Sequence, residues 1–293
     1  MKRIHIMTIG MLAQMFYFFG KFHDLEAARD DYEEMLFAVK EAGFDGVDVT
    51  SLEKNILGIH WIREQLEKKG LSVGSYIYFD QFALPDQSET ERMTKIREAV
   101  DAAKELSASV LMLAPMAHEG MEKESRETIH KNLISAWKPA AAYAVSNGLH
   151  PVIEDTPDLR FHLCRAADVQ SVLAAAPGLE LVYDSGNTLL VGEDPVEYAG
   201  KFRGNIGYVH LKDIRTLEPG TESREYMSDG TPVEGAPIGT GLVDISGVIS
   251  CLREMGYDND MTVEFVRHPE KSYPESLRES YERAASQIHQ EQA

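Results

Sequence analysis

Short runs of β-type residues alternate along the chain with longer segments whose apolar residues recur at helical spacing. The first run is RIHIMTIG, and the segment after it repeats apolar residues every three or four positions between Tyr32 and Ala42. Gly43 comes after that segment, in the place where glycine often ends a helix. The pattern therefore predicts a strand followed by a helix.

This strand-then-helix unit recurs along the whole chain. The predicted strands are RIHIMTIG, GVDVT, LSVGSYIYF, SVLMLAP, LHPVIEDT, LELVYDS, IGYVHLKD and MTVEF. One of the helices is predicted to begin at Ser88, where Glu91 three residues later fits a capping box. A long segment rich in glycine and proline, from 217 to 241, precedes the last unit and carries no predicted element.

Eight alternating units predict an α/β fold, namely a single (β/α)₈ TIM barrel that occupies residues 1–293 as one domain. A doubly wound open sheet is the alternative. Its dinucleotide-binding form loses its main support, because no GxGxxG motif comes after the first strand.

Composition limits the classes of partner. The chain has 293 residues and a formal net charge of −19, which disfavours binding to nucleic acid. The cysteines, Cys164 and Cys251, do not have metal-site spacing and are expected to be reduced thiols. No apolar run approaches the roughly 20 residues that span a bilayer, and the N-terminus reads as a strand rather than a signal peptide. We expect a soluble, cytoplasmic protein without a membrane partner.

Four potential metal ligands lie at or just beyond the ends of predicted strands: Glu154, Asp184, His210 and Glu264. In a TIM barrel the carboxyl ends of the strands meet at one mouth, so these side chains are expected to converge. Three crowded carboxylates would repel by about 4 kcal/mol for each pair at about 4 Å. A divalent cation would remove this repulsion, and oxygen ligands with one imidazole suit Mn²⁺.

Each of these residues also has an ordinary structural interpretation. Glu154 could begin a solvated loop, Asp184 could cap a turn, and His210 could be a satisfied histidine within the barrel. Glu264 is harder to explain, because a carboxylate in the apolar run VEFV loses hydration unless it is paired or bound to metal. Together the four residues favour a metal site.

The motifs around these residues resemble those of the xylose isomerase-like barrels, which include sugar-phosphate isomerases and epimerases, ketose 3-epimerases and inosose dehydratases. The resemblance covers the whole chain and rests on VIED around Glu154, VYDSGN around Asp184, VHLKD around His210, VEF around Glu264, and GTG at 239–241. It implies that the four residues bind one divalent metal, most often Mn²⁺, Co²⁺ or Mg²⁺, with Zn²⁺ as a further candidate.

The sequence departs from the family pattern in two places, and each limits the function that the resemblance implies. Some epimerases of the family carry a histidine three residues after the ligand aspartate, where this chain has Asn187, and a substrate-binding role for that position is correspondingly weaker. The endonuclease IV branch has additional histidine ligands on earlier strands, whereas the third and fourth predicted strands here end without histidine. This absence and the negative charge argue against DNA repair.

The resemblance implies an isomerase in which a metal stabilises an enediolate next to a carbonyl. Glu154 and Glu264 are expected to act as the acid–base pair, one on each face of the substrate, which would invert a carbon next to a ketone. An aldose–ketose isomerase and an inosose-type dehydratase, a lyase, share the same first step. A sugar-binding barrel without catalysis is a further alternative.

Substrate contacts are expected near the metal. The candidates are Asn187, Lys212, Asp213 and Arg215. Lys212 and Asp213 lie just beyond His210 and can reach substrate hydroxyl groups, and Arg215 can reach an anionic group. Lys212 could equally be an ordinary surface lysine. The expected substrate is a small carbohydrate, with or without a phosphate. The aromatic patch at 16–19 is expected to pack in the core, or else to form a lid or a contact of a homo-oligomer, as a dimer or tetramer.

Overall fold

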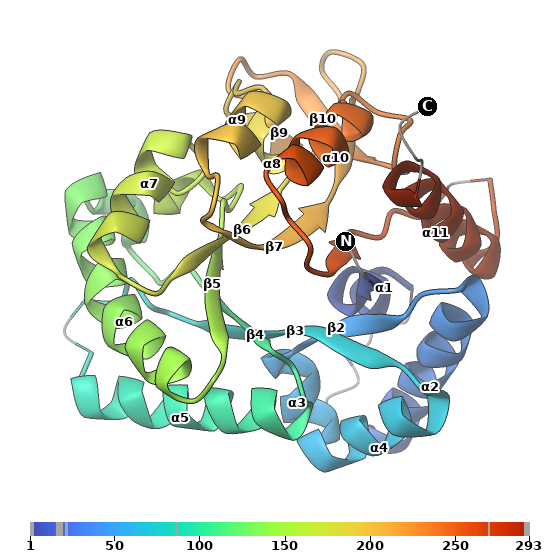
Figure 1. The fold of residues 1–293 in the computed structure, drawn as a ribbon, viewed down its shortest axis with the longest axis horizontal. Helices are drawn as coiled ribbons and strands as arrows, with labels where there is room; N and C mark the ends of the chain where they lie inside the picture. Colours follow the sequence, from blue (N-terminus) through green and yellow to red (C-terminus); the bar gives the residue numbers. More distant parts are fainter. Residues whose placement is uncertain (1–2, 16–19, 21–22, 86, 269, 290–293) are drawn as a thin grey trace.

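The computed structural model describes residues 3–15, 20, 23–85, 87–268 and 270–289. Within these residues, parallel strands close into a barrel in the order β1-β11-β7-β6-β5-β4-β3-β2 (Figure 1). The barrel strands are β1 (Ile4–Met7), β2 (Gly46–Thr50), β3 (Ser72–Asp80), β4 (Val110–Pro115), β5 (His150–Glu154), β6 (Glu180–Asp184), β7 (Ile206–Leu211) and β11 (Met261–Val263). The predicted α/β TIM barrel is confirmed, and each predicted strand is present.

Helices surround the outside of this barrel (Figure 1). Their bounds are α1 (Thr8–Met15), α2 (Leu25–Ala42), α3 (Ser51–Leu57), α4 (Ile59–Lys69), α5 (Glu89–Glu105), α6 (Arg126–Ser146), α7 (Ala166–Ala175), α8 (Asn187–Leu190), α9 (Pro195–Lys201), α10 (Ile245–Glu254) and α11 (Tyr273–His289). Short 3₁₀ turns cover η2 (Met121–Lys123) and η3 (Leu159–Phe161). None of the described helices combines the length and apolar character needed to cross a membrane.

Local sequence explains where several helices begin and end. Gly43 ends α2 with φ of 107°, a left-handed conformation that suits glycine. The capping box predicted at Ser88 is wrong, because the Ser88 side chain accepts no hydrogen bond at the start of α5. Thr50 and Glu53 form such a box at α3 instead, where the Thr50 hydroxyl and the Glu53 carboxylate accept hydrogen bonds from each other's backbone amides.

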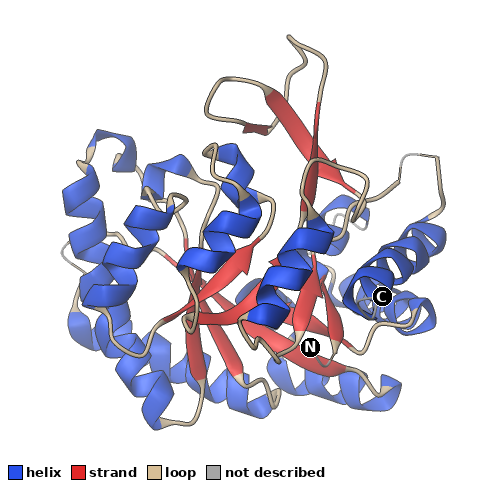
Figure 2. Cartoon of the chain, turned by 45° about the horizontal axis from the view of Figure 1, so that its top comes forward, coloured by secondary structure: helices blue, strands red, loops and turns tan. Residues whose placement is uncertain are grey.

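A second, small sheet comes after β7 and rises above the barrel (Figure 2). It is antiparallel in the order β8-β10-β9 and consists of β8 (Asp213–Thr216), β9 (Glu225–Tyr226) and β10 (Pro232–Ala236). The sequence predicts only an irregular segment from 217 to 241. These strands give no clear sequence signal, because they are two to five residues long and contain Pro232 and Gly235, which weaken a strand pattern.

The interior of the barrel is divided into an apolar part and a polar part. Apolar side chains from β3 to β6, with Tyr208 of β7, form one buried cluster. Beside it, His5, Asp48 and Thr262 are fully buried polar residues. Gly74 makes room for them, since a Cβ there would lie 2.1 Å from Tyr208 Oη and 2.7 Å from Asp48 Oδ1. The barrel interior therefore contains a network of buried polar side chains below its mouth.

Candidate metal centre

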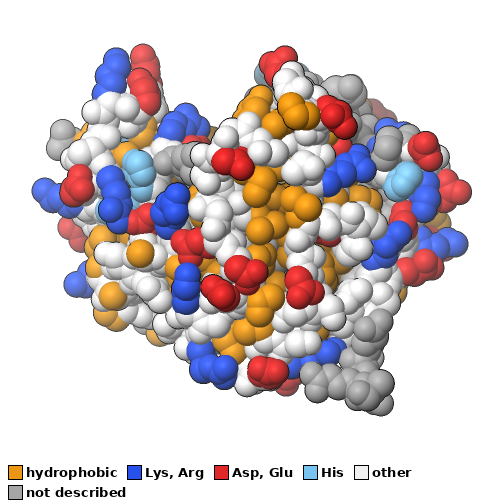
Figure 3. Space-filling view, turned by 90° about the horizontal axis from the view of Figure 1, so that it is seen from above, with side chains coloured by type: hydrophobic (Ala, Val, Ile, Leu, Met, Phe, Trp, Pro, Cys, Tyr) orange, Lys and Arg blue, Asp and Glu red, His pale blue; other side chains and the backbone are white. Residues whose placement is uncertain are grey.

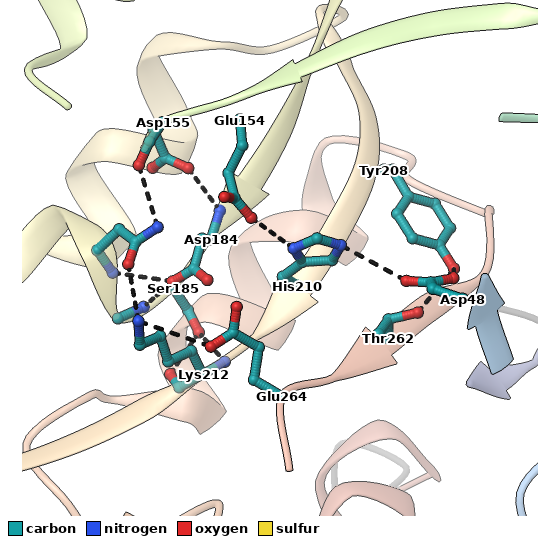
Figure 4. A network of polar contacts seen from close by, with 12 residues as sticks. Asp48, Glu154, Asp155, Asp184, Ser185, Tyr208, His210, Lys212, Thr262 and Glu264 are labelled. Atoms are coloured by element: carbon teal, nitrogen blue, oxygen red, sulfur yellow. Dashed lines mark hydrogen bonds and ion pairs between the residues drawn. The ribbon is translucent and has the colours of Figure 1, made fainter. Parts of the chain in front are cut away.

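The four predicted ligands come together at the mouth of the barrel (Figure 4). Glu154 ends β5, Asp184 ends β6, His210 lies in β7 and Glu264 comes directly after β11, and these strands are neighbours in the barrel. The register places Asp184 opposite His210. Each residue offers one ligand atom, and these atoms all lie within 4.8 Å of one another. The barrel topology thus brings together residues that are far apart in the sequence.

Asp184 is buried, and only one of its two carboxylate oxygens accepts hydrogen bonds from the described residues. Its Oδ1 accepts hydrogen bonds of 2.8 Å from the backbone N–H groups of Gly186 and Asn187, so it does cap the next turn. Its Oδ2 is buried and accepts no hydrogen bond from the described residues. Burial, and then the neighbouring carboxylate of Glu264, raise the pKa of Asp184 well above its ordinary value. A free, buried oxygen of this kind fits a cation ligand.

His210 is fully buried and lies between two carboxylates. Its Nδ1 is 2.6 Å from Glu154 Oε1, on the side of the cluster, and its Nε2 is 3.6 Å from Asp48 Oδ2, on the opposite side. Burial alone would lower the pKa of His210, but the facing carboxylates of Asp48 and Glu154 outweigh it and raise the pKa well above its ordinary value. Because Nδ1 contacts Glu154 and Nε2 faces Asp48, Nδ1 is the nitrogen on the side of the other candidate ligands.

Glu264 and the small sheet both contact the buried side chain of Lys212. Lys212 Nζ lies 3.6 Å from Glu264 Oε2 and donates hydrogen bonds to Glu225 Oε1 of β9, at 3.1 Å, and to Asn187 Oδ1, at 3.0 Å. Burial alone would raise the pKa of Glu264, yet Lys212 and then His210 bring it below its ordinary value. The side chain of Glu264 keeps 24% of its surface exposed, so it borders the open part of the mouth.

Taken as a donor set, the cluster fits a divalent cation. It offers carboxylate oxygens from Glu154, Asp184 and Glu264 and an imidazole nitrogen from His210. Asp155, behind Asp184, is also fully buried, and burial together with the charge of Asp184 raises its pKa well above its ordinary value. Such crowding of acidic groups is unfavourable by itself and is relieved by a positive ion.

The predicted substrate contacts are placed in different surroundings. Asn187 is buried, and its amide donates to the backbone oxygen of Asp155 while its oxygen accepts from Lys212. Asp213 is fully buried, and its carboxylate accepts hydrogen bonds from backbone amides of its own strand and of the loop at 239–243. Arg215 is exposed and pairs with Glu234 of β10. Lys212 and Asn187 both contact the cluster of candidate ligands, Lys212 through Glu264 and Asn187 through the hydrogen bond from its backbone N–H to Asp184.

A cavity of about 520 Å³ lies beside the cluster. Its lining includes Lys212, Glu264 and residues of the small sheet such as Glu225, with the guanidinium-bearing residues Arg224 and Arg267. The volume suits a small polar molecule. On the face shown in Figure 3, Lys and Arg side chains lie among Asp and Glu side chains, and the described residues form no basic stripe there.

Several residues of this network were not singled out from the sequence. Asp48 lies inside the β-type run GVDVT, and a charged residue in such a run is the same signal that identified Glu264. Asp155 adjoins Glu154, but nothing in the sequence distinguishes it from a loop aspartate. Glu225 lies 13 residues beyond Lys212 and reaches it only through the folding of the small sheet. The aromatic patch at 16–19 lies outside the described residues.

Comparisons with known proteins agree with this architecture. The family model described as "Xylose isomerase-like TIM barrel" matches residues 36–283. An inosose dehydratase of Clostridium tetani is 23% identical over 265 residues, which cover 84% of this chain and 86% of the relative. The inosose dehydratase of Lacticaseibacillus casei is 28% identical over 99 residues, a match that spans only 33% of either chain.

Solved structures share the fold at low sequence identity. L-ribulose 3-epimerase matches with a TM-score of 0.72 and 16% identity, over 98% of this chain and 95% of that chain. The IOLI protein with a binding zinc atom matches with a TM-score of 0.72 and 14% identity, over 98% of both chains. At this level of identity the similarity concerns the fold of the barrel and does not identify the reaction.

Proposed function

The chain belongs to the xylose isomerase-like TIM-barrel family, and from that premise we propose that it is a metal-dependent isomerase or epimerase of a small carbohydrate. The reaction starts with removal of a proton from the carbon next to a carbonyl group. The observation that carries the proposal is the cluster of Glu154, Asp184, His210 and Glu264, whose ligand atoms lie within 4.8 Å of one another.

In this proposal the four residues hold one divalent cation. When bound, the cation would polarise the substrate carbonyl and stabilise negative charge on its oxygen. The unpartnered Oδ2 of Asp184 and the cluster-facing Nδ1 of His210 support this assignment. Three oxygen donors and one nitrogen donor favour Mn²⁺, and the zinc bound by the IOLI protein leaves Zn²⁺ as the competing ion.

Glu154 and Glu264 are proposed as the acid–base pair because they enter the cluster from opposite sides, with Asp184 and His210 between them (Figure 4). One carboxylate takes the proton from the carbon, and the electron pair of the broken C–H bond moves to the carbonyl oxygen, which gives an enediolate. The other carboxyl group returns a proton to the opposite face. The net result is inversion at that carbon, without change in composition.

Lys212 is placed to assist this chemistry. Its ammonium group lies near Glu264 and keeps the pKa of that carboxyl below its ordinary value, so Glu264 starts as the ionised base. The cavity lined by Lys212 and the small sheet gives the remainder of the substrate a place beside the cluster. The polar contacts of Lys212 with Asn187 and Glu225 hold the ammonium in position.

A dehydratase of an inosose is the second candidate, and the curated relatives favour it. The relatives from Clostridium tetani and Lacticaseibacillus casei carry the name inosose dehydratase. Elimination uses the same removal of a proton next to a carbonyl, after which the electron pair expels a β-hydroxyl group, which leaves as water with a proton from the second carboxyl group. The two reactions therefore differ in the fate of the enediolate and share the roles of Glu154 and Glu264.

Product analysis separates the two candidates. The Mn²⁺-loaded protein would be incubated with a panel of ketoses, aldoses and inososes, with and without phosphate, and the products analysed by mass spectrometry and chromatography. A product of unchanged mass supports an isomerase or epimerase, and a product lighter by one water supports a dehydratase. Lack of conversion across the panel, by protein shown to bind Mn²⁺, would contradict both.

A further inference from the structure

Asp48 lies below the candidate metal centre and faces the back of His210. It belongs to the middle of β2 and is fully buried. Its Oδ2 is 3.6 Å from His210 Nε2, and both atoms are buried without a hydrogen-bond partner among the described residues. Figure 4 shows the imidazole ring between Asp48 on one side and Glu154 on the other. Two unsatisfied buried atoms thus face each other.

The other oxygen of Asp48 is firmly held. Oδ1 accepts a hydrogen bond of 2.8 Å from the backbone N–H of Ser75 and one of 3.1 Å from the hydroxyl of Tyr208. The Tyr208 oxygen lies in turn 2.8 Å from Thr262 Oγ1. Because Gly74 has no side chain, the network has room inside the barrel, where branched apolar side chains usually pack. The carboxylate is therefore fixed with Oδ2 directed at the histidine.

We propose that Asp48 is a positioning residue that sets the tautomer and orientation of His210. With the ring proton on Nε2 and donated to Asp48, the lone pair of Nδ1 is directed at the other ligands. Histidines that bind metals commonly donate their second N–H to a carboxylate in this way, and loss of that partner weakens metal binding about 10- to 100-fold. This inference rests on the proposed function, since it assigns His210 as a metal ligand.

The alternative is that Asp48 only ties β2 to β3 and β7 through Ser75 and Tyr208. The two roles predict different results for Asp48→Asn. An asparagine can keep its oxygen toward Ser75 and Tyr208, and its amide group would then face His210 Nε2 as a donor. That arrangement forces the ring proton onto Nδ1, the nitrogen that should bind the metal. A purely structural residue would leave metal affinity unchanged.

The test is titration of the intact protein with Mn²⁺ by calorimetry. We expect Asp48→Asn to bind Mn²⁺ about 10- to 100-fold more weakly than wild type. The control, Asp45→Asn, changes the carboxylate that accepts from Ile4 N just before the same strand and should bind as wild type does. Circular dichroism and urea unfolding establish that each variant is folded.

A second variant and a second readout guard against failure of Asp48→Asn to fold. Tyr208→Phe removes one hydrogen bond to Asp48 and should weaken Mn²⁺ binding several-fold. The ¹⁵N spectrum of the histidines in Zn²⁺-loaded wild type should place the proton of His210 on Nε2, with the signal assigned from His210→Gln. A proton on Nδ1, or unchanged Mn²⁺ affinity in the folded variants, would overturn the role of Asp48. Absence of Mn²⁺ binding by wild type would instead overturn the metal site itself.

Discussion

At the residue scale, single buried ionisable groups, in the site and outside it, have identifiable effects on stability. Lys212 joins Glu264 at the mouth to Glu225 of the small sheet, and its side chain is only 10% exposed. Glu53, at the start of α3, accepts hydrogen bonds from the Thr8 hydroxyl and the Thr50 amide and is fully buried. Both residues allow predictions about stability that do not depend on the substrate.

Lys212→Met should destabilise the metal-free protein by about 3 kcal/mol, because removal of the ammonium group leaves buried Asp184 and the partly buried carboxylates of Glu225 and Glu264 without a counter-charge. Saturating Mn²⁺ should reduce this cost, since the ion supplies positive charge beside Glu264 and Asp184. Urea unfolding with and without Mn²⁺ measures both quantities. Lys271→Met, which breaks a partly exposed pair and leaves Glu279 paired with Arg283, should cost less than about 1 kcal/mol in either condition. Equal losses for the two variants would contradict this account.

Glu53→Gln should change how stability depends on pH. Burial raises the pKa of Glu53 to about 7 from an ordinary value of 4.5, so the folded protein binds more protons than the unfolded chain between these pH values. Protonated Glu53 therefore makes its whole contribution to the free energy of unfolding below pH 4.5. This contribution decreases by about 3 kcal/mol as the pH rises to about 7.

Urea unfolding at a series of pH values measures this effect. Between pH 4.5 and about 7, the free energy of unfolding should decline less with rising pH in Glu53→Gln than in wild type. Glu105→Gln is the matched control, because the pKa of the partly exposed Glu105 is lowered by its hydrogen bond to His60, and this variant should not flatten the decline. Parallel curves for wild type and Glu53→Gln would show that Glu53 does not titrate in this range.

At the element scale, the site depends on where strands end and on the segments that continue from them. Strands β5, β6, β7 and β11 deliver the candidate ligands, and β7 continues directly into the small sheet through Lys212 and Asp213. Asp213 Oδ1 accepts from the amides of Ile214 and Val243, and Oδ2 accepts from those of Gly239 and Gly241. The loop before α10 is thereby attached to the start of β8.

Asp213→Asn should loosen this loop. An amide oxygen can accept only part of these hydrogen bonds, and bonds to a charged acceptor contribute about 1.5–3 kcal/mol each, so we expect a loss of at least about 2 kcal/mol. Hydrogen exchange of the Gly239, Gly241 and Val243 amides should become faster. Asp244→Asn is the control, because asparagine also caps a helix and Asp244 caps α10. Weaker substrate binding with unchanged exchange would instead support the predicted substrate contact of Asp213.

The sequence was sufficient to predict the barrel and the convergence of the four candidate ligands, because both depend on periodicity and on strand ends. Glu264 is recognisable as a charge within an apolar run, and Asp48 carries the same signal inside GVDVT but was not predicted. The small sheet and the contact of Glu225 with Lys212 were not predictable. They depend on short strands paired across a long loop, for which the sequence has no periodic pattern.

At the scale of the whole molecule, the barrel places its polar residues along one path. The path runs from the cavity beside Lys212, through the ligand cluster, to Asp48 and Tyr208 in the interior. The formal net charge of −19 suits a cation at the mouth better than a polyanionic partner. We propose that this arrangement removes a proton next to a carbonyl group, with Glu154 and Glu264 as the acid–base pair.

Solvent exchange tests that claim most directly. Wild-type protein loaded with Mn²⁺ would be incubated in D₂O with the converted ketose or inosose, and deuterium at the carbon next to the carbonyl measured by NMR and mass spectrometry. We predict incorporation that requires Mn²⁺ and falls at least about 100-fold in Glu154→Gln and in Glu264→Gln. Conversion of substrate by the wild-type protein without deuterium incorporation, or unchanged exchange in both variants, would contradict the account.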